Sequence, residues 1–290
     1  MLLFIHIMSN VFKGIRLPDH IILGAAKAGT SSIHHYLDQH PDVFVPSPKE
    51  LKFFTRPGEP DRDEYARYFA PNTDGKKVME VSSDYLYSGE STPRKIKKIV
   101  PDVGLIAILR DPVERGFSDF CMDVDHGKQQ KDYRKALRGR SRFRYRNQGL
   151  YHKQLSRYIE VFDRERIGIF FFEDLKRDTA GFMRKLYRYI GVTEDVTARG
   201  HFNKGSFSKS EHVQALLNRP NPVRRAIKSI LSPFLNADKR QRLRSRLLAL
   251  NRSPKPRIDP ELRSELVEFY RDDILKLQEL TGRDLSAWLK

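Results

Sequence analysis

Apolar positions along this chain fall into two kinds of segment that alternate. The first kind is a short, mainly apolar run typical of a buried strand, found at residues 21–23, 78–81, 105–109 and 167–172. The second kind repeats apolar positions at helical spacing, at residues 33–39, 92–100, 150–162, 180–190 and 261–280. Near-continuous apolar strands that alternate with helices indicate a parallel sheet covered on both faces. We therefore predict an α/β, three-layer fold with a central parallel sheet flanked by helices.

The loop after the first apolar run predicts an anion site. It reads Gly24-Ala25-Ala26-Lys27-Ala28-Gly29-Thr30-Ser31-Ser32 and leads into a predicted helix. Free backbone N–H groups of such a loop and of a helix N-terminus can hold a phosphate. The spacing of Gly24 and Gly29 matches the nucleotide P-loop, G-x-x-x-x-G-K-[ST]. Thr30 stands where that motif has lysine, however, and Lys27 lies inside the loop. The fold is therefore predicted to be P-loop-like, with a different phosphate donor.

A second strand end carries a second candidate anion site. Ligands of doubly wound sheets bind at the carboxyl ends of the strands. Arg110 leaves the run 105–109 at such an end, and Ser118 follows two helical turns later. A guanidinium and a hydroxyl can together grip a phosphate, although an ion pair of Arg110 with Asp111 or Glu114 at the helix start is the alternative. Two separate anion sites suit a nucleotide phosphorylated at both ends.

At these two segments the chain resembles the sulfotransferases that use 3′-phosphoadenosine 5′-phosphosulfate (PAPS). In that family a K-x-G-T-[ST] loop binds the 5′-phosphosulfate, and an R-D-P…S segment binds the 3′-phosphate. The resemblance covers about residues 20–205 and is closest to the carbohydrate branch, including heparan-sulfate-type domains, and to bacterial relatives. It implies PAPS as co-substrate, its bisphosphate PAP as product, and no metal. The nucleotide-binding residues that it implies are Lys27, Ala28, Gly29, Thr30, Ser31, Ser32, Arg110, Ser118, Tyr151, Lys204 and Gly205.

The same resemblance implies the catalytic groups. The segment 50–54 is similar to the family's E-x-x-F-F, whose glutamate is the catalytic base, so Glu50 is expected to take the acceptor's proton. Lys27 is expected to neutralise the leaving oxygen. The heparan-type motif E-K-[ST]-P-x-Y reads here as Glu80 to Tyr85, with Val81 in place of the lysine. Lys52 is one candidate substitute. The residues predicted to contact the acceptor are Lys52, Asp84, Tyr85 and His126.

Positive charge is concentrated in two segments. The formal net charge is +17, of which residues 128–157 carry +10 and residues 219–257 carry +11, which leaves −4 for the remainder. Basic segments on a near-neutral body indicate an anionic partner. The second segment is predicted to be helical and amphipathic. It could lie on an anionic membrane surface, cover the acceptor cleft, or pack on the sheet with its charges solvated. No motif for specific nucleic-acid recognition is present.

Composition supports a single domain over residues 1–290 with a sizeable core, since 39% of the residues are hydrophobic. The single cysteine, Cys121, excludes an internal disulfide framework and multi-cysteine metal sites, and it favours a reducing, cytoplasmic compartment. The apolar first eight residues are too few for a spanning helix and lack the features of a signal peptide.

The function expected is transfer of a sulfuryl group from PAPS to an acceptor hydroxyl by in-line displacement. Carbohydrate is the expected acceptor, with a lipid or another small molecule as alternatives. A P-loop kinase or NTPase is a second hypothesis, although no lysine follows Gly29 and no acidic residue directly follows the strand at Leu109. A basic module that binds anionic polymers or membranes is the third hypothesis. It would not need Lys27, Arg110 and Ser118 together.

Overall fold

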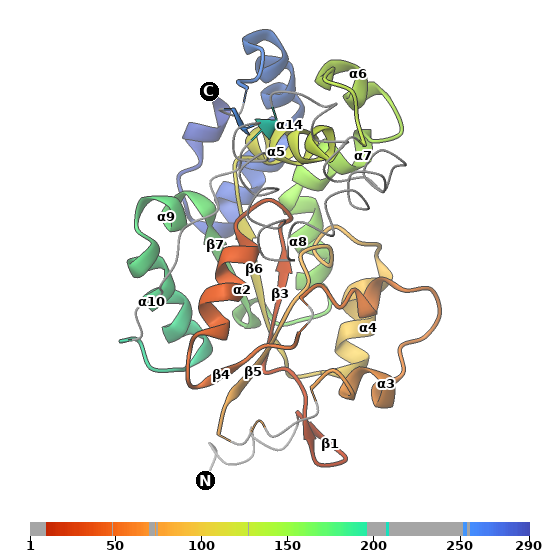
Figure 1. The fold of residues 1–290 in the computed structure, drawn as a ribbon, viewed down its shortest axis with the longest axis vertical. Coiled ribbons are helices and arrows are strands. Elements are labelled where there is room, and N and C mark those ends of the chain that lie inside the picture. Colours follow the sequence, from red (N-terminus) through yellow and green to blue (C-terminus); the bar gives the residue numbers. More distant parts are fainter. Residues whose placement is uncertain are drawn as a thin grey trace, which may run out of the picture.

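A five-stranded parallel sheet forms the centre of the computed structural model, in the order β4-β5-β3-β6-β7 (Figure 1). The structure describes residues 10–47, 49–69, 73, 75–126, 128–195 and 256–290, together with the backbone of two short paired strands, β8 (Phe207–Ser208) and β9 (Arg252–Ser253). The sheet strands are β3 (His20–Gly24), β4 (Val43–Phe44), β5 (Lys77–Val81), β6 (Gly104–Leu109) and β7 (Ile167–Phe171). A small antiparallel hairpin precedes them, with strands β1 (Val11–Phe12) and β2 (Ile15–Arg16).

Helices cover both faces of this sheet, which confirms the predicted three-layer α/β fold. In Figure 1, α2, α9 and α10 lie on one side of the sheet, and α4 and α8 lie on the other. The helices are α2 (Thr30–Asp38), α3 (Arg62–Ala66), α4 (Ser91–Ile99), α5 (Pro112–Asp125), α6 (Tyr133–Arg138), α7 (Arg142–Tyr145), α8 (Tyr151–Ile159), α9 (Phe172–Arg177), α10 (Thr179–Ile190) and α14 (Pro260–Thr281). Short 3₁₀ turns lie at Phe53–Thr55, Asn147–Gly149, Arg164–Arg166 and Ser286–Leu289.

The strand order indicates a ligand-binding crevice between the carboxyl ends of β3 and β6. From β3 the chain continues to β4 and β5 on one side of the sheet, whereas from β6 it continues to β7 on the other side. Neighbouring strands whose connections diverge in this way leave an opening between their loops, and ligands bind there. The loop after Gly24 and the loop after Leu109 flank this point. Both predicted anion sites therefore lie at the topological switch of the sheet.

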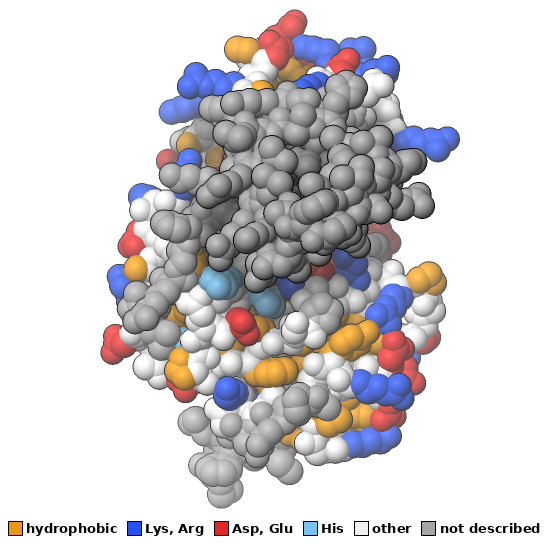
Figure 2. All heavy atoms as spheres, in the orientation of Figure 1, with side chains coloured by type: hydrophobic (Ala, Val, Ile, Leu, Met, Phe, Trp, Pro, Cys, Tyr) orange, Lys and Arg blue, Asp and Glu red, His pale blue; other side chains and the backbone are white. Residues whose placement is uncertain are grey.

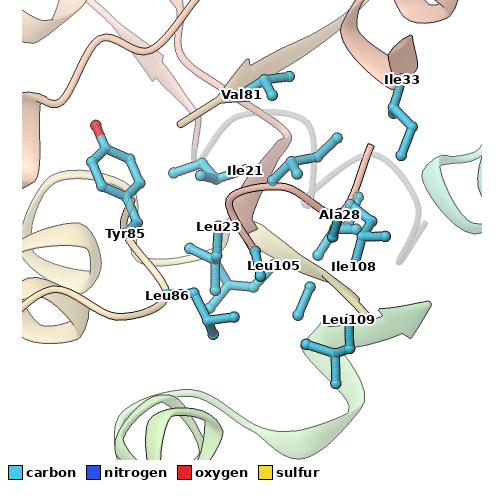
Figure 3. Close-up of a cluster of buried hydrophobic side chains, with 14 of the residues drawn as sticks. Ile21, Leu23, Ala28, Ile33, Val81, Tyr85, Leu86, Leu105, Ile108 and Leu109 are labelled. Carbon is cyan, nitrogen blue, oxygen red and sulfur yellow. The ribbon is translucent and has the colours of Figure 1, made fainter. Parts of the chain in front are cut away.

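The core consists of the apolar runs that predicted the strands. Ile21, Leu105, Ile108 and Leu109 are completely buried, and Figure 3 shows them with side chains from the neighbouring loops and from α2. Burial of a large aliphatic side chain contributes about 1.5–3 kcal/mol relative to leaving it exposed. The central strands are thus a rigid base that positions the loops at their carboxyl ends.

Capping residues fix where the helices begin and end around this base. The Asp111 carboxylate accepts hydrogen bonds from the backbone N–H groups of Val113 and Glu114, at 2.8 and 3.1 Å. Pro112 occupies the first position of α5, where its missing N–H costs nothing. Gly191 ends α10 with a left-handed conformation at φ 73°. The sequence Arg-Asp-Pro therefore stops β6 and starts α5 immediately beside the crevice.

The first basic segment is docked onto the body of the protein. The Arg144 guanidinium on α7 holds the buried carboxylate of Asp119 on α5 through two hydrogen bonds of 2.9 and 2.7 Å. Arg134 on α6 contacts Glu265 and Glu261 on α14, and Figure 2 shows acidic and basic side chains interspersed at that upper end of the molecule. These basic residues thus join helices to one another. Nearly all of the second basic segment, 219–257, lies outside the described residues, as do residues 1–9.

Within the described residues, the longest helix is too polar to cross a lipid bilayer, and none of the others qualifies either. The same part of the chain contains no group of three or more His, Cys, Asp or Glu side chains arranged to hold a metal ion.

Candidate active site

The loop between β3 and α2 has the backbone shape of an anion cradle. Lys27 and Gly29 adopt left-handed conformations at φ 71° and 86°. A Cβ atom on Gly29 would lie 2.8 Å from Leu175 Cδ2, so a larger residue does not fit against α9. No side chain caps the N-terminus of α2, which begins at Thr30. The Ser32 N–H donates to the Gly29 carbonyl at 3.0 Å, which leaves the N–H groups of Thr30 and Ser31 for an anionic ligand.

Lys27 extends from this loop toward α5. Its Nζ lies 3.2 Å from the sulfur of Met122, which is a weak acceptor. Burial lowers the pKa of Lys27, partly opposed by the charge of Asp119. A desolvated ammonium without a strong partner gains more from an incoming anion than a solvated one does. The Lys27 ammonium is thus suited to bind an anionic group at this end of the crevice.

Arg110 connects the second anion site directly to the first. Its Nη1 donates a 3.0 Å hydrogen bond to the backbone carbonyl of Lys27, and its guanidinium stacks on the Phe172 ring at 4.7 Å. Its other terminal nitrogen lies 3.8 Å from Glu114 Oε2, which is a looser contact. The two predicted sites therefore form one surface. The sequence left an ion pair of Arg110 with Glu114 as an alternative, and this pair is present. The guanidinium is held mainly by the Lys27 carbonyl and the Phe172 ring.

Ser118 lies on the same stripe of α5 as two residues that contact these groups. Glu114, Ser118 and Met122 are four residues apart, so their side chains leave the helix on one face. Glu114 approaches Arg110 and Met122 approaches Lys27. Ser118 is half-buried between them. The structure thus joins Lys27 to Arg110 and places Ser118 on the adjoining face of α5, and phosphate binding by these three residues stays a prediction.

Glu50 lies at the carboxyl end of β5 and is held by three neighbours. Its backbone adopts a left-handed conformation at φ 66°, and its N–H donates to the carbonyl of Val81 at 3.0 Å. Its carboxylate accepts hydrogen bonds from the N–H and hydroxyl of Ser83, each at 2.8 Å. The Lys49 ammonium donates to the same carboxylate. A carboxylate fixed in this way is suited to accept a proton from a positioned hydroxyl.

The sequence of this chain matches a known family. The family model described as the sulfotransferase domain matches residues 17–219, which is well over half of the chain. The chain belongs to the sulfotransferase family. The resemblance inferred from the loop and from the Arg-Asp-Pro segment is therefore confirmed, and the kinase or NTPase hypothesis is not favoured.

Two human proteins and one bacterial structure illustrate the relationship of this sulfotransferase to known proteins. It is 26% identical over 294 residues to heparan sulfate glucosamine 3-O-sulfotransferase 3B1 of Homo sapiens, covering 96% of this chain and 68% of that protein. It is 27% identical over 281 residues to human heparan sulfate glucosamine 3-O-sulfotransferase 6, covering 93% and 74%. The crystal structure of a sulfotransferase from Alicyclobacillus acidocaldarius is 27% identical, with a TM-score of 0.70 over 95% of this chain and 100% of that chain.

Two residues predicted to contact ligands are instead part of the core of the sulfotransferase. Tyr85 is completely buried, and its hydroxyl donates to Glu80 Oε1 at 2.6 Å and accepts from the Phe53 N–H at 2.9 Å. Tyr151 is also completely buried, with its ring 6.2 Å from that of Trp288. Neither side chain is placed on the surface of the crevice. The predicted acceptor contact of Tyr85 and the predicted nucleotide contact of the Tyr151 side chain are therefore corrected.

The other predicted acceptor residues remain near Glu50 or at the rim. Lys52 Nζ lies 3.7 Å from Asp84 Oδ2. Burial raises the pKa of Asp84, Lys52 opposes the rise, and the charge of Glu50 adds to it. The second oxygen, Oδ1, is buried and has no hydrogen-bond partner among the described residues. His126 is exposed just past the end of α5, and its contact with an acceptor stays a prediction.

Sequence reasoning missed residues that the fold brings to the site from a distance. Lys49 is one, because only its neighbour Glu50 carried a motif. Arg263 on α14 is another: it donates to the Asp111 carboxylate at 2.9 Å and to Glu114 at 3.2 Å, and so ties α14 to the start of α5. No local pattern signals a contact that spans so much of the chain. Lys204 and Gly205, predicted to close over the 3′-phosphate, lie outside the described residues.

Proposed function

We propose that this sulfotransferase transfers the sulfuryl group of PAPS to a hydroxyl group of a carbohydrate acceptor by in-line displacement. The observation that carries the donor assignment is the 3.0 Å hydrogen bond from Arg110 to the Lys27 carbonyl. It joins the cradle at the start of α2 to the Arg110–Ser118 region of α5. One nucleotide with phosphate groups at both ends fits such a surface, whereas ATP carries its phosphates at one end only.

The residues at the two ends of the crevice have separate tasks. PAPS, when bound, supplies a sulfuryl group linked to an oxygen of its 5′-phosphate. The backbone N–H groups of Thr30 and Ser31 at the start of α2 bind that phosphate, and Arg110 with Ser118 binds the 3′-phosphate. Binding of both ends fixes the position of the sulfur atom relative to the protein, which is the main source of rate in group transfer of this kind.

Glu50 accepts the proton of the acceptor, and Lys27 stabilises the charge of the leaving group. The acceptor oxygen forms a bond to sulfur while Glu50 takes its proton. The bond between sulfur and the 5′-phosphate oxygen breaks, and its electron pair remains on the departing bisphosphate. Lys27 stabilises the negative charge that develops on that oxygen. General-base catalysis is worth about 100- to 10,000-fold in rate.

Two features support a carbohydrate acceptor. The human relatives named above are heparan sulfate glucosamine 3-O-sulfotransferases, as their names state. In this chain, charged groups lie beside Glu50, where the exposed Lys52 ammonium is 3.7 Å from Asp84 Oδ2. Sugar hydroxyl groups can donate to carboxylates and accept from ammonium groups. A lipid acceptor, a peripheral contact with an anionic membrane, and a cytoplasmic location stay predictions from the charge and cysteine content.

Incubation with sulfur-labelled PAPS and a panel of acceptors tests this proposal. The panel contains neutral glycans, sulfated glycans, glycolipids and phenols. We expect label on a glycan hydroxyl, dependent on Lys27 and abolished by excess adenosine 3′,5′-bisphosphate. Label that appears only on phenols or lipids would overturn the acceptor assignment. Absence of transfer together with absence of bisphosphate binding would overturn the donor assignment.

A further inference from the structure

This sulfotransferase lacks a lysine at the position where the heparan-type motif has one. Val81 follows Glu80 in the segment that resembles E-K-[ST]-P-x-Y. Its side chain is only 2% exposed and belongs to the apolar cluster in Figure 3, which also contains Ile33 and Ala28. Position 81 therefore supplies packing to the core and presents no charge to the crevice. If the reaction needs a cation beside Glu50, another position must provide it.

The backbone places residue 49 next to position 81. The Glu50 N–H donates to the Val81 carbonyl at 3.0 Å, so the segment 49–50 runs alongside the end of β5. The left-handed backbone of Glu50, at φ 66°, turns the chain sharply at this point. A side chain at position 49 therefore starts in the space beside the carboxyl end of β5.

Lys49 occupies that space with its ammonium group. Its Nζ donates to Glu50 Oε1 and lies 3.4 Å from the hydroxyl oxygen of Thr30. Glu50 is the expected base, and Thr30 is the first residue of α2 in the phosphate cradle. Only 20% of the Lys49 side chain is exposed. The Lys49 ammonium therefore contacts both the expected base, Glu50, and the phosphate cradle at Thr30.

Lys52, the substitute suggested by the sequence, is placed differently. Its ammonium lies 3.7 Å from Asp84, and 60% of its side chain is exposed. Lys52 is itself a second left-handed residue, with φ 53°. Within the described residues, the contacts of Lys49 and not those of Lys52 join Glu50 to the cradle.

We propose that Lys49 is the positioning residue that replaces the motif lysine missing at position 81. It holds the Glu50 carboxylate at a fixed distance from the Thr30 hydroxyl, and so aligns the base with the donor side of the crevice. This inference rests on the proposed function, because it assigns Lys49 a task in that same proton transfer. Misplacement of a catalytic group by about 1 Å can cost about 100-fold in rate.

The first test compares Lys49→Met and Lys49→Arg with a matched control. Lys98→Met is the control, because Lys98 forms only a surface pair with Glu59 at 2.6 Å. We expect kcat of Lys49→Met to fall about 100-fold, with the Kd for adenosine 3′,5′-bisphosphate within about threefold of wild type. Lys49→Arg should recover most of the loss, and Lys98→Met should match wild type. If Lys49→Met acted only by destabilising the fold, a smaller fraction of the protein would be active and Lys49→Arg would not restore kcat. That result would contradict the inference.

The second test asks whether Lys49 acts through Glu50. If it does, the effects of the two residues are not additive, and we expect the double variant Lys49→Met/Glu50→Gln to have a kcat within about threefold of Glu50→Gln alone. Full turnover in Lys49→Met would overturn the inference while leaving the proposed function intact. So would a double variant that binds the bisphosphate normally but loses a further factor of about 100 in kcat relative to Glu50→Gln. A wild-type protein that binds no bisphosphate would instead overturn the proposed function.

Discussion

A substitution at Gly116 on α5 tests how the first basic segment, residues 128–157, packs against the body of the protein. A Cβ atom at this position would lie 2.1 Å from the backbone carbonyl oxygen of Tyr145 and 2.8 Å from the hydroxyl of Tyr133. The Tyr145 carbonyl also accepts a 2.9 Å hydrogen bond from the fully buried Arg115 guanidinium. The absence of a side chain at Gly116 is therefore what lets α7 approach α5 closely. We predict that Gly116→Ala destabilises the protein.

The expected size follows from three contributions. Alanine is a better helix former than glycine by about 1 kcal/mol, which favours the variant. Overpacking against an atom that cannot move freely costs about 1–3 kcal/mol. Displacement of the Tyr145 carbonyl weakens a hydrogen bond to the charged Arg115, which is worth about 1.5–3 kcal/mol. The net prediction is a loss of about 1.5–5 kcal/mol in the free energy of unfolding.

Urea denaturation followed by fluorescence of Trp288 measures this difference. Trp288 is the single tryptophan of the chain and is 4% exposed, so unfolding changes its surroundings. Gly139→Ala in the same basic segment is the matched control, because its Cβ would meet nothing closer than a carbonyl oxygen at 3.6 Å. It should change stability by no more than about 0.5 kcal/mol. A Gly116→Ala variant as stable as wild type, or more stable, would refute the close contact between α5 and α7.

Three further predictions address the base, the nucleotide site and pH. Glu50→Gln should lower kcat about 100- to 10,000-fold without changing the Kd for adenosine 3′,5′-bisphosphate, whereas the surface control Glu59→Gln should match wild type; full activity of Glu50→Gln would remove Glu50 as base. Arg110→Lys keeps the charge but loses the planar fork, so calorimetric titration should show bisphosphate binding weakened about 10- to 100-fold, and unchanged affinity would contradict the role of Arg110. Burial lowers the pKa of His20 from 6.5 to about 4, so the folded state resists protonation and stability falls as pH drops from 6.5 toward 4, by up to about 3 kcal/mol. A wild-type protein whose unfolding free energy follows the same pH dependence as His20→Gln would refute that burial.

The sequence predicted the parts of the fold that depend on local patterns. Uninterrupted apolar runs located β3, β6 and β7, and the residues that end them located the crevice. Asp111 and Pro112 start α5 where local capping rules place it. The start of α4 differs from the range 92–100 that the apolar spacing predicts. The helix begins at Ser91 without a side-chain cap, and the Thr92 hydroxyl accepts a hydrogen bond from the Ser88 hydroxyl at 3.0 Å.

The parts of the site that escaped prediction depend on backbone turns and distant contacts. Lys49 reaches Thr30 because Glu50 is left-handed, and no apolar periodicity reports that conformation. Tyr85 was expected at the crevice, but it turns inward because Glu80, buried on β5, needs hydroxyl donors. Neither fact is visible in a motif. Motifs therefore mark the loops after β3 and β6 but give no sign of these contacts around Glu50.

Competitive titration with adenosine 3′,5′-bisphosphate and ATP tests the central claim most directly, because the two nucleotides differ in whether phosphate is present at both ends. The joined surface formed by Lys27, Arg110 and Ser118 predicts tight binding of the bisphosphate and weak binding of ATP. Tight binding of ATP with no detectable binding of the bisphosphate would contradict the account.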